Sequence, residues 1–187
     1  MCFRIVRTGD VSLYIEGNTV RPEMRGRYVA EPAYQIVIDN MIMVCVDAVI
    51  INRKQRVFYL AKRVIRPMPG IWWMGGSRKK GYSPLEGICC KFREETGVDL
   101  PGDRFTFVTM TEYLWQDREQ QPQDKGSHNI CHQFAVELTD DELKIIRECL
   151  NRGEYDHTFG LQVFDRDRLM IAKVHPVILE VFDKIFP

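Results

Sequence analysis

The sequence has no long apolar run, no surplus of charge of one sign and no paired cysteine motif. No stretch approaches the about 20 consecutive apolar residues that a membrane-spanning helix needs, and the residues after Met1 lack the apolar core of a signal peptide. Lys and Arg number 26, as do Asp and Glu, so the chain has no excess of positive charge for general nucleic-acid binding. We therefore expect a soluble, cytoplasmic protein that binds neither membranes nor nucleic acid.

The six cysteines, at positions 2, 45, 89, 90, 131 and 149, lack the spacing of a zinc site. Cys45 and Cys131 fall inside apolar runs typical of strands, where a buried cysteine behaves as a small hydrophobic residue. We predict free thiols, which suits a reducing compartment.

The hydrophobic pattern predicts one α/β domain with an N-terminal addition, since 187 residues suffice for a single core. Residues 1–30 contain two short β-type runs, 3–6 and 11–16, and are expected to form a β-hairpin followed by the turn signal Gly17-Asn18. Residues 31–187 are expected to form the main domain.

Within the main domain, apolar periodicity and turn residues predict the order of elements. We expect a helix over 33–41, strands over 43–51, 56–62 and 71–74, a helix from Ser83-Pro84 to Gly97, strands over 105–115 and 129–138, a helix over 139–150, a strand over 160–164 and two short helices, the last over 176–185. The polar segment 116–128 is expected to be a mobile loop.

The stretch from Gly75 to Val98 resembles the Nudix box, in which a glycine, five residues, Glu and seven residues precede Arg-Glu-apolar-any-Glu-Glu-any-Gly-apolar. The positions in register are Gly76, Phe92, Glu94, Glu95 and Gly97-Val98. The alternative is an ordinary turn followed by a solvated helix end. The resemblance implies the Nudix α/β/α sandwich with a mixed β-sheet.

Three positions of the box depart from the pattern. Tyr82 stands at the first Glu, Cys90 at the Arg, and Lys91 at the first metal-binding Glu of the helix. Carboxylates spaced i, i+4 share a helix face and can hold Mg²⁺, whereas a protonated lysine cannot. Of that pair only Glu95 remains, so the metal site is expected to be weakened or rebuilt.

Residues 46–49, 61–67 and 70–76 resemble the GDP-mannose mannosyl hydrolase branch of this superfamily. That resemblance implies attack of water at the sugar anomeric carbon, a general base outside the box, and one Mg²⁺ (or Mn²⁺) that neutralises the leaving diphosphate. Carried over by position, the metal ligands are the Gly75 carbonyl, Glu95 and Asp156. His157 is the candidate base, since a neutral imidazole can accept a proton from water.

The remaining site residues expected are catalytic or substrate-binding. Arg63 and Glu94 join His157 among the catalytic residues, and the substrate-binding residues are Asp47, Arg63, Arg66, Arg78 and Trp73. Surface salt bridges and a solvated basic loop over 78–80 are the alternatives for the cations. Trp72 and Trp73 alternate, so one is expected in the core and the other could line the pocket.

Three histidines are expected to be structural. His128 and His132 share one face of a strand without a third metal ligand, and His175, before Pro176, is expected to cap a helix.

Three functions remain open. The first is a Mg²⁺-dependent hydrolase of a nucleotide sugar such as GDP-mannose. The second is a non-catalytic module that binds a nucleotide or a protein partner, which the departures at Tyr82, Cys90 and Lys91 favour. The third is a diphosphatase acting on another nucleoside diphosphate derivative. A homodimer, to which residues 1–30 could contribute, also stays open.

Overall fold

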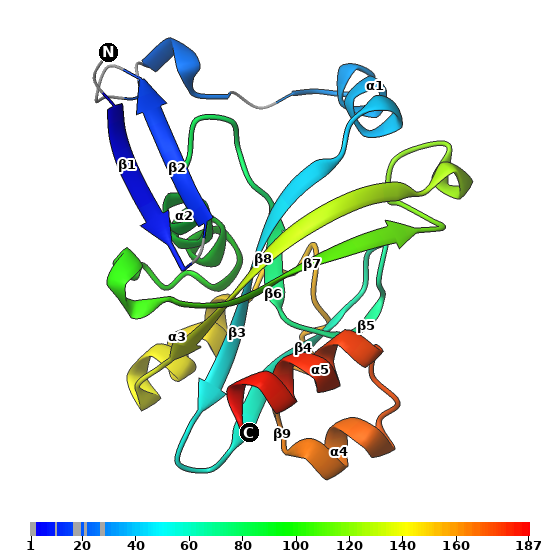
Figure 1. The fold of residues 1–187 in the computed structure, drawn as a ribbon. Coiled ribbons are helices and arrows are strands. Elements are labelled where there is room, and N and C mark those ends of the chain that lie inside the picture. Colours follow the sequence, from blue (N-terminus) through cyan, green and yellow to red (C-terminus); the bar gives the residue numbers. More distant parts are fainter. Residues whose placement is uncertain (1–2, 10, 17–19, 21, 27–28) are drawn as a thin grey trace.

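Helices cover both faces of a mixed β-sheet in this protein, for which a computed structural model describes residues 3–9, 11–16, 20, 22–26 and 29–187 (Figure 1). The strands of the sheet are β3 (Met43–Asn52), β4 (Val57–Arg63), β5 (Gly70–Trp72), β6 (Met74–Ser77), β7 (Thr106–Trp115), β8 (Ser127–Glu137) and β9 (Leu161–Phe164). The α-helices are α1 (Ala33–Asn40), α2 (Pro84–Thr96), α3 (Asp140–Cys149), α4 (Arg166–Ile171) and α5 (Pro176–Ile185). The predicted α/β/α sandwich is confirmed.

The main sheet has the strand order β5-β4-β3-β8-β7, with β6 also paired to β3 and β9 to β4. β3 and β8 run parallel, and the other pairs are antiparallel. The single strand predicted over 71–74 is wrong. Residues up to Trp72 form β5, which pairs with β4, and residues from Met74 form β6, which pairs with β3. Trp73 lies between the two strands and is fully buried.

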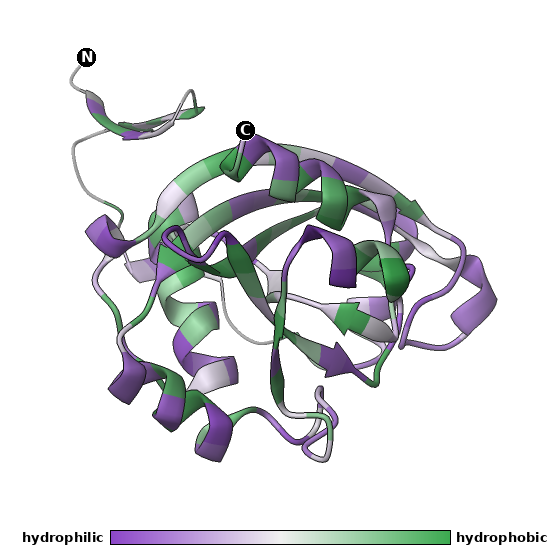
Figure 2. Ribbon diagram, turned by 90° about the horizontal axis from the view of Figure 1, so that it is seen from below, coloured by the Kyte–Doolittle hydropathy of each residue, from purple (hydrophilic) through white to green (hydrophobic). Residues whose placement is uncertain are grey.

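Alternate side chains of β3 supply two separate cores, because successive residues of a strand point to opposite faces of the sheet. Val46, Ala48 and Ile50 pack in the cluster that includes residues of α2 and α3. Cys45, Val49 and Ile51 pack in the cluster that includes residues of α4 and α5. Figure 2 shows hydrophobic residues concentrated on the strands and on the helix faces turned toward them.

The N-terminal residues form the predicted hairpin from β1 (Phe3–Thr8) and β2 (Val11–Glu16), which pair antiparallel and with no strand of the main sheet in the described residues. The hairpin stands apart from the main body (Figure 2) and touches it at its turn, where a Cβ on Gly9 would overlap the Phe107 ring. The turn signal Gly17-Asn18 lies outside the described residues.

Polar segment 116–128 is attached to α1. Within it, Arg118 is buried and lies 2.6 Å from the carboxylate of Asp39, and a short 3₁₀ helix covers Gln123–Lys125. Two more 3₁₀ turns cover Pro22–Met24 and Gly102–Arg104. Among the described helices, none has the length and apolar character needed to cross a membrane.

Candidate functional site

Helix α2 carries the acidic end of the box, and local sequence fixes both of its ends. Ser83 Oγ accepts a hydrogen bond from the Glu86 N–H at 3.2 Å, and the Glu86 carboxylate accepts one from the Ser83 N–H at 2.8 Å. Gly97 ends the helix with φ 75°, a conformation that favours glycine. The helix then places Lys91 and Glu95, four residues apart, on the face that meets β6.

Glu95 is anchored beneath the glycine strand, and its side chain is 0% exposed. Its Oε2 accepts hydrogen bonds from the Gly75 N–H at 2.9 Å and from the Tyr155 hydroxyl at 2.5 Å. Burial, followed by the charge of Glu95, raises the pKa of Tyr155 well above its usual value, so the hydroxyl keeps its proton and donates. These contacts hold the carboxylate in a fixed position.

Lys91 occupies the other side of the same carboxylate. Its Nζ lies 2.9 Å from Glu95 Oε1 and 3.7 Å from Glu154 Oε1, and its side chain is 19% exposed. Burial lowers the pKa of Lys91, but the two carboxylates outweigh burial and raise it. Burial raises the pKa of Glu95, and Lys91 acts against that shift. We therefore treat Lys91 as an ammonium between two carboxylates.

Glu154 reaches Lys91 and Glu95, the pair that we call the centre, because its loop pairs with the end of β4. The Val64 N–H donates to the Glu154 carbonyl at 2.8 Å, and Arg63 Nη2 lies 3.9 Å from Glu154 Oε2. Sequence analysis singled out Arg63 but missed Glu154 and Tyr155. The only available signal was their position directly before Asp156 and His157, which had been predicted as site residues.

Asp47 lies behind the glycine strand, opposite Gly75 in the β3–β6 pair. A Cβ on Gly75 would overlap Asp47 Oδ1, so only glycine lets the two strands approach this closely. Burial raises the pKa of Asp47 to about 7, and the charge of Arg63 acts in the opposite direction. Asp47 thus forms a buried floor to the centre.

The expected base and third metal ligand contact other groups. His157 Nε2 lies 2.5 Å from the Leu150 carbonyl, so this nitrogen carries the proton and donates. Asp156 lies 3.4 Å from Lys62 Nζ and also accepts from backbone N–H groups of its own loop. Among the described residues, no hydrogen bond or ion pair joins Asp156 or His157 to Lys91 or Glu95.

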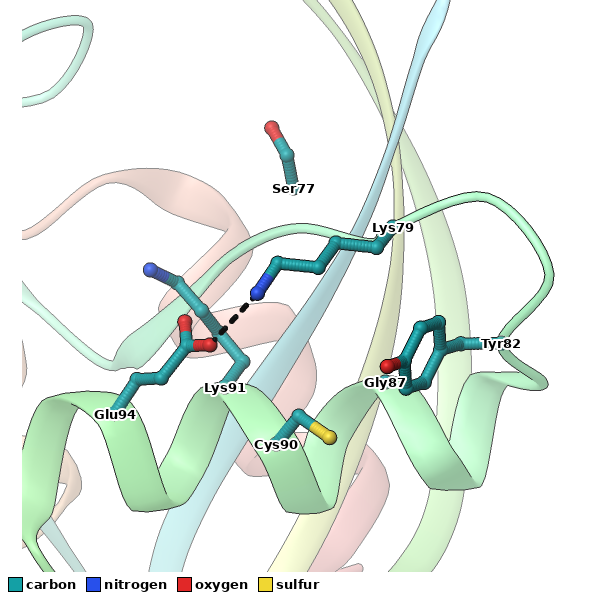
Figure 3. A pocket seen from close by; sticks show the side chains of 7 residues that line it. All are labelled: Ser77, Lys79, Tyr82, Gly87, Cys90, Lys91 and Glu94. Carbon is teal, nitrogen blue, oxygen red and sulfur yellow. Dashed lines mark hydrogen bonds and ion pairs between the residues drawn. The ribbon is translucent and has the colours of Figure 1, made fainter. Parts of the chain in front are cut away.

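A narrow groove of about 10 Å³, room for roughly one water molecule, runs between α2 and the loop that follows β6 (Figure 3). Lys79 reaches across it and pairs with Glu94 at 3.0 Å (Figure 3). The lining residues are Ser77, Lys79, Tyr82, Gly87, Cys90, Lys91 and Glu94. The groove thus contains all three positions that depart from the box pattern.

Arg78 is a third cation near Lys79 and Lys91, and it lies closer to the sheet. A Cβ on Gly87 would lie 2.8 Å from Arg78 Cγ, so the arginine packs directly on α2. Its guanidinium is half-buried and forms no ion pair or hydrogen bond within the described part of the chain. Burial lowers its pKa. Burial, and after it the charge of Arg78, also lowers the pKa of His132.

Segment 22–26 lies against the loop that precedes α2. The Arg25 guanidinium sits 4.4 Å from the centre of the Tyr82 ring and pairs with Glu86 at 3.1 Å. The Gly26 N–H donates to the Lys80 carbonyl at 2.8 Å. Tyr82 is therefore a docking surface for the N-terminal addition.

Arg66 and the two tryptophans lie away from the groove. Arg66 pairs with Asp117 at 3.2 Å and donates to Gln123 at 2.6 Å. Trp72 and Trp73 are both buried, so the expectation that one could line a pocket is not met. Their rings lie 4.9 Å apart in the core beside α5, and Trp73 Nε1 has no acceptor among the described residues.

The other histidines contact protein groups. His128 Nε2 lies 2.6 Å from Glu112, and His132 Nδ1 lies 3.4 Å from the Cys45 carbonyl. His175 Nδ1 accepts from the Val177 N–H at 3.3 Å, which confirms the predicted cap of α5.

The residues at the centre do not fit a divalent cation. In the ranges that the structure describes, no three His, Cys, Asp or Glu side chains are arranged to hold one. Glu95 Oε2 accepts from Gly75 and Tyr155, and Glu95 Oε1 faces Lys91. An ammonium without a lone pair therefore stands where the resemblance implied a metal ion.

Comparison with known proteins identifies the fold. No family model matches the sequence, and no curated protein is significantly similar to it. A MutT Nudix hydrolase from Burkholderia pseudomallei is 17% identical, with 78% of this chain and 98% of that chain covered and a TM-score of 0.54. A Nudix hydrolase from Nitrosomonas europaea is 15% identical, with 76% of this chain and 87% of that chain covered and a TM-score of 0.53.

The dihydroneopterin triphosphate pyrophosphohydrolase of E. coli is 14% identical, with 75% of this chain and 92% of that chain covered and a TM-score of 0.50. Identities this low concern the fold alone. The chain has the fold of the Nudix hydrolases.

Proposed function

We propose that this protein binds a nucleoside diphosphate derivative over the face of α2 that borders the glycine loop, outside the narrow groove itself, with a sugar nucleotide of the GDP-mannose type as the first candidate. The observation that carries the proposal is the row of cations on the side of α2 that faces the glycine loop. Arg78 packs on Gly87, Lys91 follows one helical turn later, and Lys79 reaches in from the loop. Guanidinium and ammonium groups are the usual protein partners of phosphate.

Arg78 is the residue whose replacement tests the proposed binding most directly. A half-buried guanidinium without a protein acceptor is unfavourable on its own, and a phosphate oxygen would supply the missing acceptor. The phosphate class of ligand is supported by the fold, since the similar E. coli enzyme is named for a triphosphate. The sugar nucleotide is supported by the resemblance of residues 46–49, 61–67 and 70–76 to mannosyl hydrolases.

Hydrolysis of the same ligand is the second candidate, and Lys91 is the observation that favours it. A fixed ammonium can stabilise the negative charge of a departing diphosphate when water attacks the sugar carbon. His157 is the proposed base, because the proton on Nε2 leaves Nδ1 able to accept one from water. Arg63 and Glu94 would then act near the diphosphate, and Mg²⁺ or Mn²⁺ is an additive to be varied.

Isothermal titration with GDP-mannose, GDP and mannose in the presence of EDTA tests binding. We expect the two nucleotides to bind and mannose not to. Arg78→Ala should weaken binding about tenfold, as expected for the loss of one charged contact of roughly 1.4 kcal/mol. The matched control is Lys54→Ala, which removes one charge from the exposed β3–β4 turn and should bind like the wild type. Equal affinities for all three proteins would refute the proposed site.

Product analysis in ¹⁸O-labelled water separates binding alone from hydrolysis, and the position of the label identifies the atom that water attacks. Label in the sugar means attack at carbon, and label in the phosphate means attack at phosphorus. Binding without any product, in Mg²⁺, Mn²⁺ or EDTA, leaves the binding module as the function.

A further inference from the structure

We infer that the ammonium of Lys91 takes the place of a divalent cation beside Glu95, and that the residue at position 91 decides which cation this centre holds. The native protein would then bind no divalent metal here. The inference concerns the cation alone and does not depend on the nucleotide proposed above.

The first step is the compensation of a buried charge. Glu95 Oε1 is buried and receives no hydrogen bond from the described residues. The group that faces it is Lys91 Nζ, at 2.9 Å. A buried carboxylate oxygen needs a positive partner, and here the protein supplies its own.

The second step is the fixed position of the lysine. Its stem crosses Gly76, where a Cβ would lie 2.6 Å from Lys91 Cε, so the glycine makes room for the lysine. Glu154, from the loop after α3, holds the ammonium from a second side at 3.7 Å. Moving Lys91 into solvent would leave Glu95 without its cationic partner and Glu154 with Arg63 alone.

The third step is the exclusion of a second cation. Mg²⁺ binds oxygen at about 2.1 Å, so an ion on Glu95 Oε1 would lie within roughly 5 Å of the ammonium at its present position. Like charges at that distance repel strongly where solvent screening is weak. The ammonium and a metal ion therefore compete for one place.

The fourth step is what a carboxylate at position 91 would do. It would share the helix face of Glu95, with Glu154 opposite, and so bring three carboxylates together near the Gly75 strand. Hard divalent cations prefer such oxygen ligands. Lys91→Glu should therefore create a metal site.

Titration with Mn²⁺, followed by the electron paramagnetic resonance signal of the free ion, tests the inference without any nucleotide. We expect no binding to the wild type up to about 1 mM, the weak end of protein sites for divalent cations. Lys91→Glu should bind one Mn²⁺ at least tenfold more tightly than Lys91→Gln, which removes the ammonium without adding a carboxylate. Lys54→Glu, with the same change of net charge on a distant turn, should behave like the wild type.

Two results would overturn the inference. One is Mn²⁺ binding to the wild type that Glu95→Gln abolishes, because the ion would then displace Lys91. The other is a folded Lys91→Glu variant that binds no better than Lys91→Gln. If Lys91→Glu does not fold, the wild-type titration and its Glu95→Gln control still decide.

Discussion

Replacement of Glu95 by Gln removes one negative charge from the centre and keeps the shape of the side chain. The amide oxygen can still accept from Gly75 and Tyr155, but Lys91 loses its partner at 2.9 Å and keeps only Glu154 at 3.7 Å. Removal of one partner from a buried ion pair costs about 3–5 kcal/mol. Because Lys91 is 19% exposed and keeps a second carboxylate, we expect a loss of about 2–3 kcal/mol.

Urea unfolding, followed by circular dichroism, measures this loss in the free energy of unfolding. For a chain of this length, about 1 kcal/mol corresponds to a shift in Tm of about 2–4 °C, so Glu95→Gln should melt roughly 4–12 °C lower. The matched control is Glu94→Gln, because Glu94 is 45% exposed and its pair with Lys79 should contribute less than about 1 kcal/mol.

The double variant Lys91→Met with Glu95→Gln tests the ion pair as a unit. It removes both charges together, and apolar replacements of buried ion pairs are often neutral or stabilising, so most of the lost stability should return. Equal losses for Glu94→Gln and Glu95→Gln, or no recovery in the double variant, would refute an ionised pair between Lys91 and Glu95.

Three further predictions concern the ends of α2 and the floor of the centre. Ser83→Ala removes the helix cap and should lower the free energy of unfolding in urea by about 1 kcal/mol, whereas Ser83→Asp should retain most of it. Gly97→Ala should cost at least about 1 kcal/mol in the same assay, because φ is 75° and a Cβ would lie 2.9 Å from Cys149 Cβ; an unchanged midpoint would contradict this. Burial raises the pKa of Asp47 to about 7, so the folded state keeps a proton that the unfolded state loses near pH 4, and this contribution to stability disappears as pH rises to 7. Asp47→Asn should therefore gain about 2–3 kcal/mol relative to the wild type between pH 5 and pH 8, and a pH-independent difference would contradict the raised pKa.

Sequence reasoning succeeded where the determinants are local. Both ends of α2 follow from residues within one turn of the helix end, Ser83 with Pro84 at one and Gly97 at the other. Strands β3 and β8 follow from continuous apolar runs, which suit strands buried on both faces. The division at Trp73 was missed because it depends on which strand each half pairs with, and that is a tertiary choice.

The centre was only partly predictable for the same reason. The i, i+4 spacing placed Lys91 beside Glu95 in advance. Glu154 arrives through the pairing of its loop with the end of β4, and no residue pattern near Glu154 encodes that contact. The contact of Arg25 with Tyr82 spans the distance from the N-terminal addition to the box, beyond the reach of any local signal.

Two of the departures from the box pattern suit the charges that surround them. A glutamate at position 82 would compete with Glu86 for Arg25, whereas the tyrosine ring gives that guanidinium an aromatic face. An arginine at position 90 would add a cation to a groove where Glu94 already pairs with Lys79, and cysteine avoids this.

Relative to the pattern, Tyr82 removes one negative charge, Cys90 removes one positive charge, and Lys91 replaces a negative charge by a positive one, so the formal charge changes by +1, −1 and +2. The net gain of two equals the charge of one divalent cation. Because Lys91 also lies against Glu95 and Glu154, this gain is located where the resemblance implied the metal ion, as the inference that Lys91 takes the place of a divalent cation requires.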